Sequence, residues 1–170
     1  APPPAPAPPA AWQAPQQRVT DHDSAQAQAR DLAAEVRETV ERAREMLEYG
    51  HSEQVCQLLE ALTSRSETPL PLASQVYTLL GQGCANQGYL SAAEEWCRQA
   101  IATDSLAIDA YYTLALVLQH QDRLDEAIDA MKKVVYIDRH SILGHFGLAN
   151  LYRSQGNQIQ ARRGMENARR

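Results

Sequence analysis

The sequence predicts an all-α protein built from stacked helix hairpins. Three observations carry this prediction: an apolar fraction of 44% with only 6% aromatic residues, apolar positions spaced three to four apart, and an internal repeat of about 34 residues. Alanine and leucine therefore fill the interior, which favours close-packed helices over strands of aromatic and β-branched residues. At 170 residues the chain is long enough for one or two small domains.

The composition excludes several classes of protein. The net charge of −5 argues against a general nucleic-acid binder, which usually carries a basic surplus. No apolar run approaches the ~18 residues of a membrane span, so we expect no membrane insertion. The first residues do not have the pattern of a secretory signal. Three irregularly spaced cysteines, Cys56, Cys84 and Cys97, fit a reducing compartment, and we expect a cytoplasmic protein.

The first 20 residues hold seven of the nine prolines. This composition cannot build a core and favours an extended polyproline II path, so residues 1–23 are predicted to be a Pro/Ala-rich linker, disordered or extended. A spacer to a domain upstream is the favoured interpretation, with a ligand for a proline-binding domain as the alternative. The chain is accordingly expected to be a fragment or a processed product.

Residues 24–72 are predicted to form an N-terminal helical hairpin. One apolar stripe is followed by Gly50, a typical helix C-terminus, and a second apolar face covers residues 55–62. The stripe consists of Leu32, Val36, Val40, Ala43 and Leu47. Eleven acidic and five basic residues between Asp21 and Glu67 indicate a solvated outer face. The hairpin resembles a degenerate first repeat, because the interval from Gly50 to Gly88 is 38 (88 minus 50) and not 34.

Residues 73–170 contain three repeat units, at about 74–107, 108–141 and 142–170. Small or apolar residues recur in columns at a constant step of 34 along the sequence (115 minus 81). The columns include Leu80, Leu114 and Leu148; Gly81, Ala115 and Ala149; Gly88, Asp122 and Gly156; and Ala93, Ala127 and Ala161. The small residue at 81 lets the first helix of a unit approach the second, and Gly88 permits the positive φ of a tight turn. Ser91 with Glu94 is interpreted as a capping box that opens the second helix.

A 34-residue period of two helices is identified as the tetratricopeptide repeat (TPR). The resemblance implies a right-handed α-α superhelix of TPR helix hairpins, with a concave face lined by the first helix of each unit. One departure is that Ser105 and Arg139 stand where a proline often follows the second helix.

A peptide-binding groove is predicted on the sides of these first helices that point away from the second helices. Its residues are Gln75, Thr78, Gln82, Asn86, Asp109, Tyr112, Leu116, His120, Leu143, Phe146, Asn150 and Arg153. Tyr112 and Phe146 are the candidate anchors, and packing between repeats is the alternative role for each. Repeats that clamp a chaperone's C-terminal carboxylate have Lys, Asn and Arg where this chain has Thr78, Gln82 and Tyr112. We therefore expect an amphipathic helix or an extended peptide as the ligand.

No catalytic, cofactor-binding or metal site is predicted. Gly81-Gln82-Gly83 falls inside an expected helix and lacks the third glycine of a phosphate loop. The five histidines have no metal-ligand spacing, and His145 falls in a packing column. Cys84 and Cys97 also fall in packing columns, so they are interpreted as buried thiols, with a redox pair as the alternative.

The C-terminal end is basic. Arg153, Arg162, Arg163, Arg169 and Arg170 are opposed only by Glu166. A solvated last helix is the favoured interpretation, and a docking patch for an acidic partner or for the chain's own acidic hairpin is the alternative. Because no polar capping helix follows Ala168, we expect this end to self-associate with another copy.

Three stretches resemble the C-terminal repeat domain of bacterial chemotaxis-receptor methyltransferases of the CheR type, including those of Wsp-like chemosensory pathways. They are YID at 136–138, GHFGLA at 144–149 and ARRGMENA at 161–168. Gly164 departs from the family and is expected to weaken the last helix by ~1 kcal/mol.

The resemblance implies a non-catalytic module of an S-adenosylmethionine-dependent protein-glutamate methyltransferase whose catalytic domain lies outside this chain. The expected partner is then the chemoreceptor, another pathway component or the catalytic domain itself. A free-standing assembly or secretion chaperone, or a scaffold, is the alternative. A complete enzyme is disfavoured, because no acid, base, nucleophile or metal set converges in the sequence.

Overall fold

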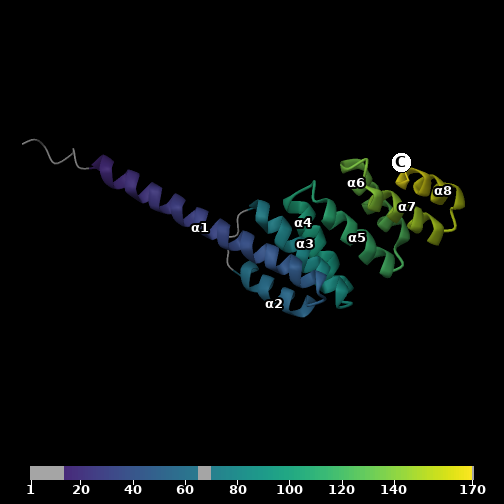
Figure 1. Ribbon diagram of the computed structural model, residues 1–170, viewed down its shortest axis with the longest axis horizontal. Coiled ribbons are helices and arrows are strands. Elements are labelled where there is room, and N and C mark those ends of the chain that lie inside the picture. The colour runs from purple at the N-terminus through teal and green to yellow at the C-terminus, as the bar shows by residue number, and fades with distance from the viewer. Residues whose placement is uncertain (1–13, 65–69, 170) are drawn as a thin grey trace, which may run out of the picture. The chain divides into compact units, whose positions relative to one another are not determined.

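The computed structural model describes residues 14–64 and 70–169, with side chains for residues 26–64 and 72–169. This part of the chain consists of helices and turns without a strand (Figure 1). The helices are α1 (Ala14–Glu48), α2 (Ser52–Thr63), α3 (Leu70–Asn86), α4 (Leu90–Thr103), α5 (Ile108–His120), α6 (Leu124–Ile137), α7 (Ile142–Ser154) and α8 (Gln158–Ala168). The predicted all-α fold is confirmed.

Helix α1 begins at Ala14 and not at the expected Ser24, so it takes in the last part of the expected linker. Pro15 does not prevent this, because proline is tolerated in the first turn of a helix, where its missing N–H needs no partner. Residues 1–13 lie outside the described residues. The chain divides into two compact units, Ala1–Glu35 and Val36–Arg170, and the hairpins described below belong to the second.

The turns inside the hairpins have the backbone that the repeat predicts. Gly88, Asp122 and Gly156 connect α3 to α4, α5 to α6 and α7 to α8, with φ of 82°, 60° and 81°. Gly50 has φ of 82° in the turn between α1 and α2. Successive hairpins then stack, since α2 packs on α3, α4 on α5 and α6 on α7 (Figure 1).

Small residues set the spacing inside each hairpin, as predicted for the column at 81. A Cβ at Gly81 would lie 2.7 Å from the Sγ of Cys97 on α4, so a side chain at this position would require the Cys97 thiol to move. Ala115 of α5 and Ala149 of α7 are buried at the equivalent places. The second-helix column of Ala93, Ala127 and Ala161 is buried as well.

Gly164 has a structural role that the sequence did not indicate. It is buried where α8 crosses α7, and a Cβ there would lie 2.9 Å from the Cβ of Ala149 and 3.1 Å from its backbone nitrogen. The glycine therefore lowers the helix propensity of α8 but permits this close crossing.

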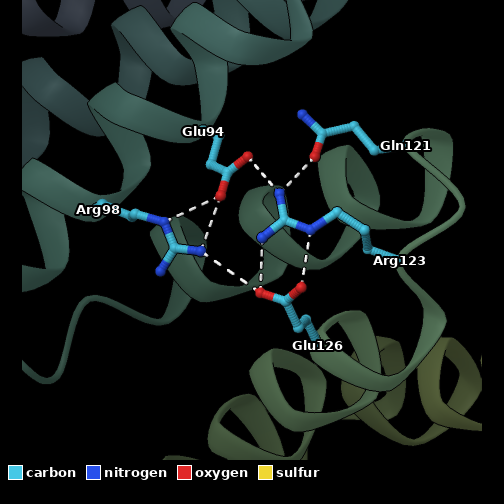
Figure 2. Close-up of polar contacts among 5 residues, drawn as sticks. All are labelled: Glu94, Arg98, Gln121, Arg123 and Glu126. Carbon is cyan, nitrogen blue, oxygen red and sulfur yellow. Dashed lines mark hydrogen bonds and ion pairs between the residues drawn. The ribbon is translucent and has the colours of Figure 1, made fainter.

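The capping box predicted for Ser91 and Glu94 is wrong. Helix α4 begins one residue before Ser91, its N-cap residue is Tyr89, and no side chain caps it. Glu94 instead accepts hydrogen bonds from Arg98 at 2.7 Å on its own helix and from Arg123 at 2.7 Å on the next hairpin (Figure 2). Glu94 therefore pairs with arginine side chains and does not cap the N-terminus of α4.

Candidate functional site

The predicted groove residues lie on α3, α5 and α7, the first helices of three successive hairpins. Four of the twelve, Gln75, Thr78, Gln82 and Asp109, line one cleft of about 460 Å³. The rest of the lining comes from α1, from the segment that links α4 to α5, and from further residues of α3 and α5. These residues are Arg44, Ser74, Leu79, Asp104, Leu106, Ala107 and Ile108.

Sequence reasoning missed Arg44 as a residue of this cleft. The interval from Arg44 to Gln82 is 38 (82 minus 44), which equals the interval from Gly50 to Gly88. Extending the groove column into the degenerate first hairpin at that interval would have found it. Asp104 and Leu106 follow the end of α4, where helical periodicity carries no information.

The hydroxyl groups in the cleft wall are satisfied within the protein. Thr78 Oγ1 donates to the backbone oxygen of Ser74 at 2.8 Å, and Ser74 Oγ donates to that of Ala100 at 3.1 Å. Asp104 Oδ1 accepts from the backbone N–H of Leu106 at 2.9 Å, which orders the segment leading into α5. These hydrogen bonds hold the three side chains in place and shape the cleft wall.

Four polar side chains in the cleft remain available for a ligand. Arg44, Gln75, Gln82 and Asp109 have no side-chain hydrogen bond or ion pair to any other described residue. Together they present one cation, one anion and two amides, each of the amides able to both donate and accept. This set suits the backbone and polar side chains of a peptide, because peptide groups also need both donors and acceptors.

The part of the predicted groove on α5 and α7 includes three exposed apolar side chains. Leu116, Leu143 and Phe146 are 38%, 62% and 46% exposed, which is high for large apolar side chains. Asp109 and Leu116 lie two turns apart and so project from the same side of α5, with Tyr112 between them. Tyr112 is partly buried and packs against the core of the hairpins, so packing contributes to its role, while Phe146 is the more exposed of the two candidate anchors.

The other four groove residues, Asn86, His120, Asn150 and Arg153, are engaged within the protein or lie at its edge. Asn86 donates its amide to Ser52 Oγ of α2 at 3.2 Å, which joins two hairpins. Arg153 donates to Asn150 Oδ1 at 2.8 Å on its own helix. His120 is exposed at the end of α5. None of these lines the cleft that holds Gln75 and Gln82.

The three thiols, and the two glycines of α3, pack in the interior of the hairpins. Cys56, Cys84 and Cys97 are free and buried. Burial raises the pKa of Cys84 and of Cys97 to about 12. The Gly81-Gln82-Gly83 segment lies inside helix α3, and a Cβ at either glycine would lie 2.7 Å from a thiol, that of Cys97 or that of Cys56.

The described residues contain no group of three or more His, Cys, Asp or Glu side chains able to hold a metal ion. His145, predicted in a packing column, is partly buried, and its Nε2 lies 3.0 Å from the backbone oxygen of Arg139. Of the described helices, none is both long and apolar enough to cross a membrane.

Comparison with known proteins agrees with this geometry. Residues 108–141, which cover α5 and α6, match the family model of the tetratricopeptide repeat. The chain has a tetratricopeptide-repeat fold. Among curated proteins, no sequence matches.

Solved TPR-type structures are similar over most of the chain. A crystal structure of MamA aligns with a TM-score of 0.69 and 21% identity, over 90% of this chain and 90% of MamA. YrrB, described as a TPR protein with an unusual peptide-binding site, aligns with a TM-score of 0.63 and 16% identity, over 74% of this chain and 63% of YrrB. At these identities the likeness concerns the fold.

Proposed function

We propose that this TPR chain is a non-catalytic protein–protein interaction module that binds a peptide segment along α3, α5 and α7. One observation carries the proposal: four unpaired polar side chains surround a cleft of about 460 Å³, and the same side of α5 continues into exposed apolar residues. Burying Leu116, Leu143 and Phe146 provides free energy of association, and the polar cleft fixes register and direction.

The ligand that fits is an amphipathic helix or an extended peptide with an apolar part and a polar part. Its apolar side chains contact Leu143 and Phe146, and its polar end lies beside Arg44 and Asp109. The peptide-binding site in the description of YrrB supports a peptide as the kind of ligand, since that protein has the same fold.

A peptide-display selection on the intact chain tests this function. Selected peptides are titrated by fluorescence anisotropy against the unchanged chain and against Phe146→Ala, Leu143→Asp and Arg44→Glu. We expect each substitution to weaken binding, by about tenfold for Phe146→Ala, because a large aromatic anchor carries one to several kcal/mol.

The matched control is Tyr136→Ala, which removes an aromatic side chain that is 76% exposed on α6. We expect it to leave the affinity unchanged. Selected peptides that tolerate all three groove substitutions and lose affinity with Tyr136→Ala would place the binding site elsewhere.

A narrower proposal concerns the parent protein. The resemblance of residues 136–168 to the repeat domain of CheR-type methyltransferases supports a role in recruiting or regulating that enzyme at chemoreceptors or other pathway partners. The MamA and YrrB folds support a free-standing scaffold at least as well. The gene sequence upstream of Ala1 distinguishes these two proposals. A methyltransferase domain there would support the role in a CheR-type enzyme, and an unrelated sequence would support the free-standing scaffold. Three free thiols support a reducing compartment such as the cytoplasm for either.

A further inference from the structure

Two faces of the hairpin stack have opposite charge and occupy complementary places in the repeat. The first is on residues 36–48 of α1, and the second is on α8. The described charged side chains on both faces are exposed, although the equivalent faces of the inner hairpins are packed on one another.

The contact between α6 and α7 shows how one hairpin receives the next. A Cβ at Gly144 of α7 would lie 3.0 Å from Val134 and from Val135 of α6, and a Cβ at Gly147 would lie 2.6 Å from the Cε of Met131. Leu151, one turn further, is buried in the same core. The positions 144, 147 and 151 therefore form the face that docks.

The corresponding face of α1 is acidic. The turn glycines Gly50 and Gly156 align α1 with α7 at a shift of 106 residues (156 minus 50). At this shift the docking positions are Glu38, Glu41 and Glu45, whose side chains are exposed and have no hydrogen-bond or ion-pair partner among the described residues. In α3 and α5 the same positions are buried. They are Val76, Leu79 and Gly83, and Ala110, Thr113 and Val117.

The receiving face of α8 is basic with an apolar floor. Moving the α6 positions 128, 131 and 135 by one repeat of 34 gives Arg162, Met165 and Arg169. Arg162 and Met165 line an open hollow of about 630 Å³ together with Arg163 and Ile159, and Ile159 is 71% exposed. On α6, the residues at 128 and 131 are buried, and Met131 contacts α7 at Gly147.

A second pair of equivalent positions is complementary in a different way. Gln155, which follows α7, donates to Asp125 Oδ1 of α6 at 2.6 Å. The same two places on the α1 face and the α8 face hold Tyr49 and Ile159, which are 80% and 71% exposed. Where the inner hairpins have the Gln155–Asp125 hydrogen bond, the two end faces have the exposed apolar side chains of Tyr49 and Ile159, which would cover each other if the two faces met.

We propose that the α8 face binds the α1 face of a second copy of this chain, so that copies join head to tail and continue the hairpin stack. Glu38 then meets Arg169, Glu45 lies toward Arg162, and Tyr49 covers Ile159. The two faces belong to opposite ends of the repeat, so the contact is heterologous and extends to chains of copies or to closed rings. Opposite charges steer the faces together and set their register.

Charge reversal on one face at a time tests the proposal. Sedimentation velocity over a range of concentrations at low ionic strength should show association for the unchanged chain and its weakening by salt. Glu38→Arg with Glu45→Arg, and separately Arg162→Glu with Arg169→Glu, should each raise the dissociation constant more than about tenfold. The control, Glu95→Arg with Arg139→Glu, reverses exposed charges on neither face and should associate as the unchanged chain does.

Mixing the two face variants with the unchanged chain identifies the geometry. Each face variant keeps one native face, so either one should end growing assemblies of the unchanged chain and lower their mean mass. A chain with both faces reversed restores the opposite charges and should associate again. Tyr49→Ser provides a test that changes no charge and should also weaken association.

Circular dichroism confirms that each variant is folded, as expected for substitutions at exposed positions. An unchanged chain that stays monomeric at every concentration would overturn the proposal. So would face variants that associate as strongly as the unchanged chain, or a doubly reversed chain that is folded and monomeric.

Discussion

Glu94 and Arg123 form an ion pair between two hairpins. Arg123 is the N-cap residue of α6, and its Nη1 donates at 2.7 Å to Glu94 of α4, whose side chain is only 17% exposed. Arg123 also donates to both carboxylate oxygens of Glu126, at 2.6 Å and 2.7 Å (Figure 2). One guanidinium thus ties the start of α6 to the preceding repeat.

Replacing Glu94 by Gln should lower the free energy of unfolding by about 1 kcal/mol, because a partly buried, charge-assisted hydrogen-bond network loses its central acceptor. Urea denaturation followed by circular dichroism measures this. Glu95→Gln, on the exposed side of the same helix, is the matched control and should have no measurable effect.

The effect of Glu94→Gln should depend on pH. Burial of Glu94 opposes its ionisation, but hydrogen bonds from Arg98 and Arg123 outweigh this and lower its pKa below 4.5. A lowered pKa in the folded state means that the stabilisation is complete above about pH 5, decreases as the pH falls through 4.5, and is lost below the folded-state pKa. The difference between the two proteins should shrink over that range. A constant difference down to the acid limit would contradict this account.

Asp122 is the one described non-glycine residue with a positive φ, at 60°, where the other repeats have Gly88 and Gly156. Asp122→Gly should raise the free energy of unfolding by about 0.5–1 kcal/mol, because an L-residue is strained there and glycine is not. Gly88→Asp is the converse, and it should lower stability by a similar amount, since a Cβ at Gly88 has open space around it. Thermal unfolding of both variants should show changes in Tm of similar size and opposite sign. Changes of Tm in the same direction for the two variants would contradict this explanation.

The hairpins, their turns and their small-residue columns could be predicted because they depend on one constant repeat length. Contacts between side chains far apart in the sequence could not be predicted from that repeat length. Glu94 looked like a local cap, and its partner Arg123 lies 29 residues away. Asn86 matched the groove pattern but bonds to Ser52, on the degenerate hairpin that precedes the regular repeats.

For the same reason, only four of the eleven residues that line the candidate cleft were predicted from the sequence. Gln75 and Gln82 follow from helical spacing, whereas Leu106 comes from the segment after α4. Gly164 is an example of a residue whose role cannot be predicted from helix propensity alone. Helix propensity correctly marks it as unfavourable, but only the crossing over Ala149 explains what the glycine permits.

Gly164→Ala should therefore destabilise the protein in spite of its better helix propensity. Alanine gains up to about 1 kcal/mol in the helix, but its methyl group would lie 2.9 Å from Ala149 Cβ and 3.1 Å from the α7 backbone. Overpacking against backbone costs about 1–3 kcal/mol, so we expect a net loss of about 1 kcal/mol. Asn167→Ala, at an exposed site on α8, is the control for propensity and should be neutral or slightly stabilising. A more stable Gly164→Ala variant would show that α8 can move away from α7.

The three thiols should be unreactive in the folded protein. With their pKa raised to about 12 by burial, Cys84 and Cys97 are thiolates in only about one molecule in ten thousand at pH 8, and the thiolate is the form that attacks a disulfide reagent. Cys56 is also buried, its pKa is raised, and its Sγ accepts a hydrogen bond from Gln87. A thiol titration should detect almost none of the three in the native state and all three after denaturation. Rapid reaction of two thiols in the native state, with formation of a disulfide, would favour the redox pair over the packing role.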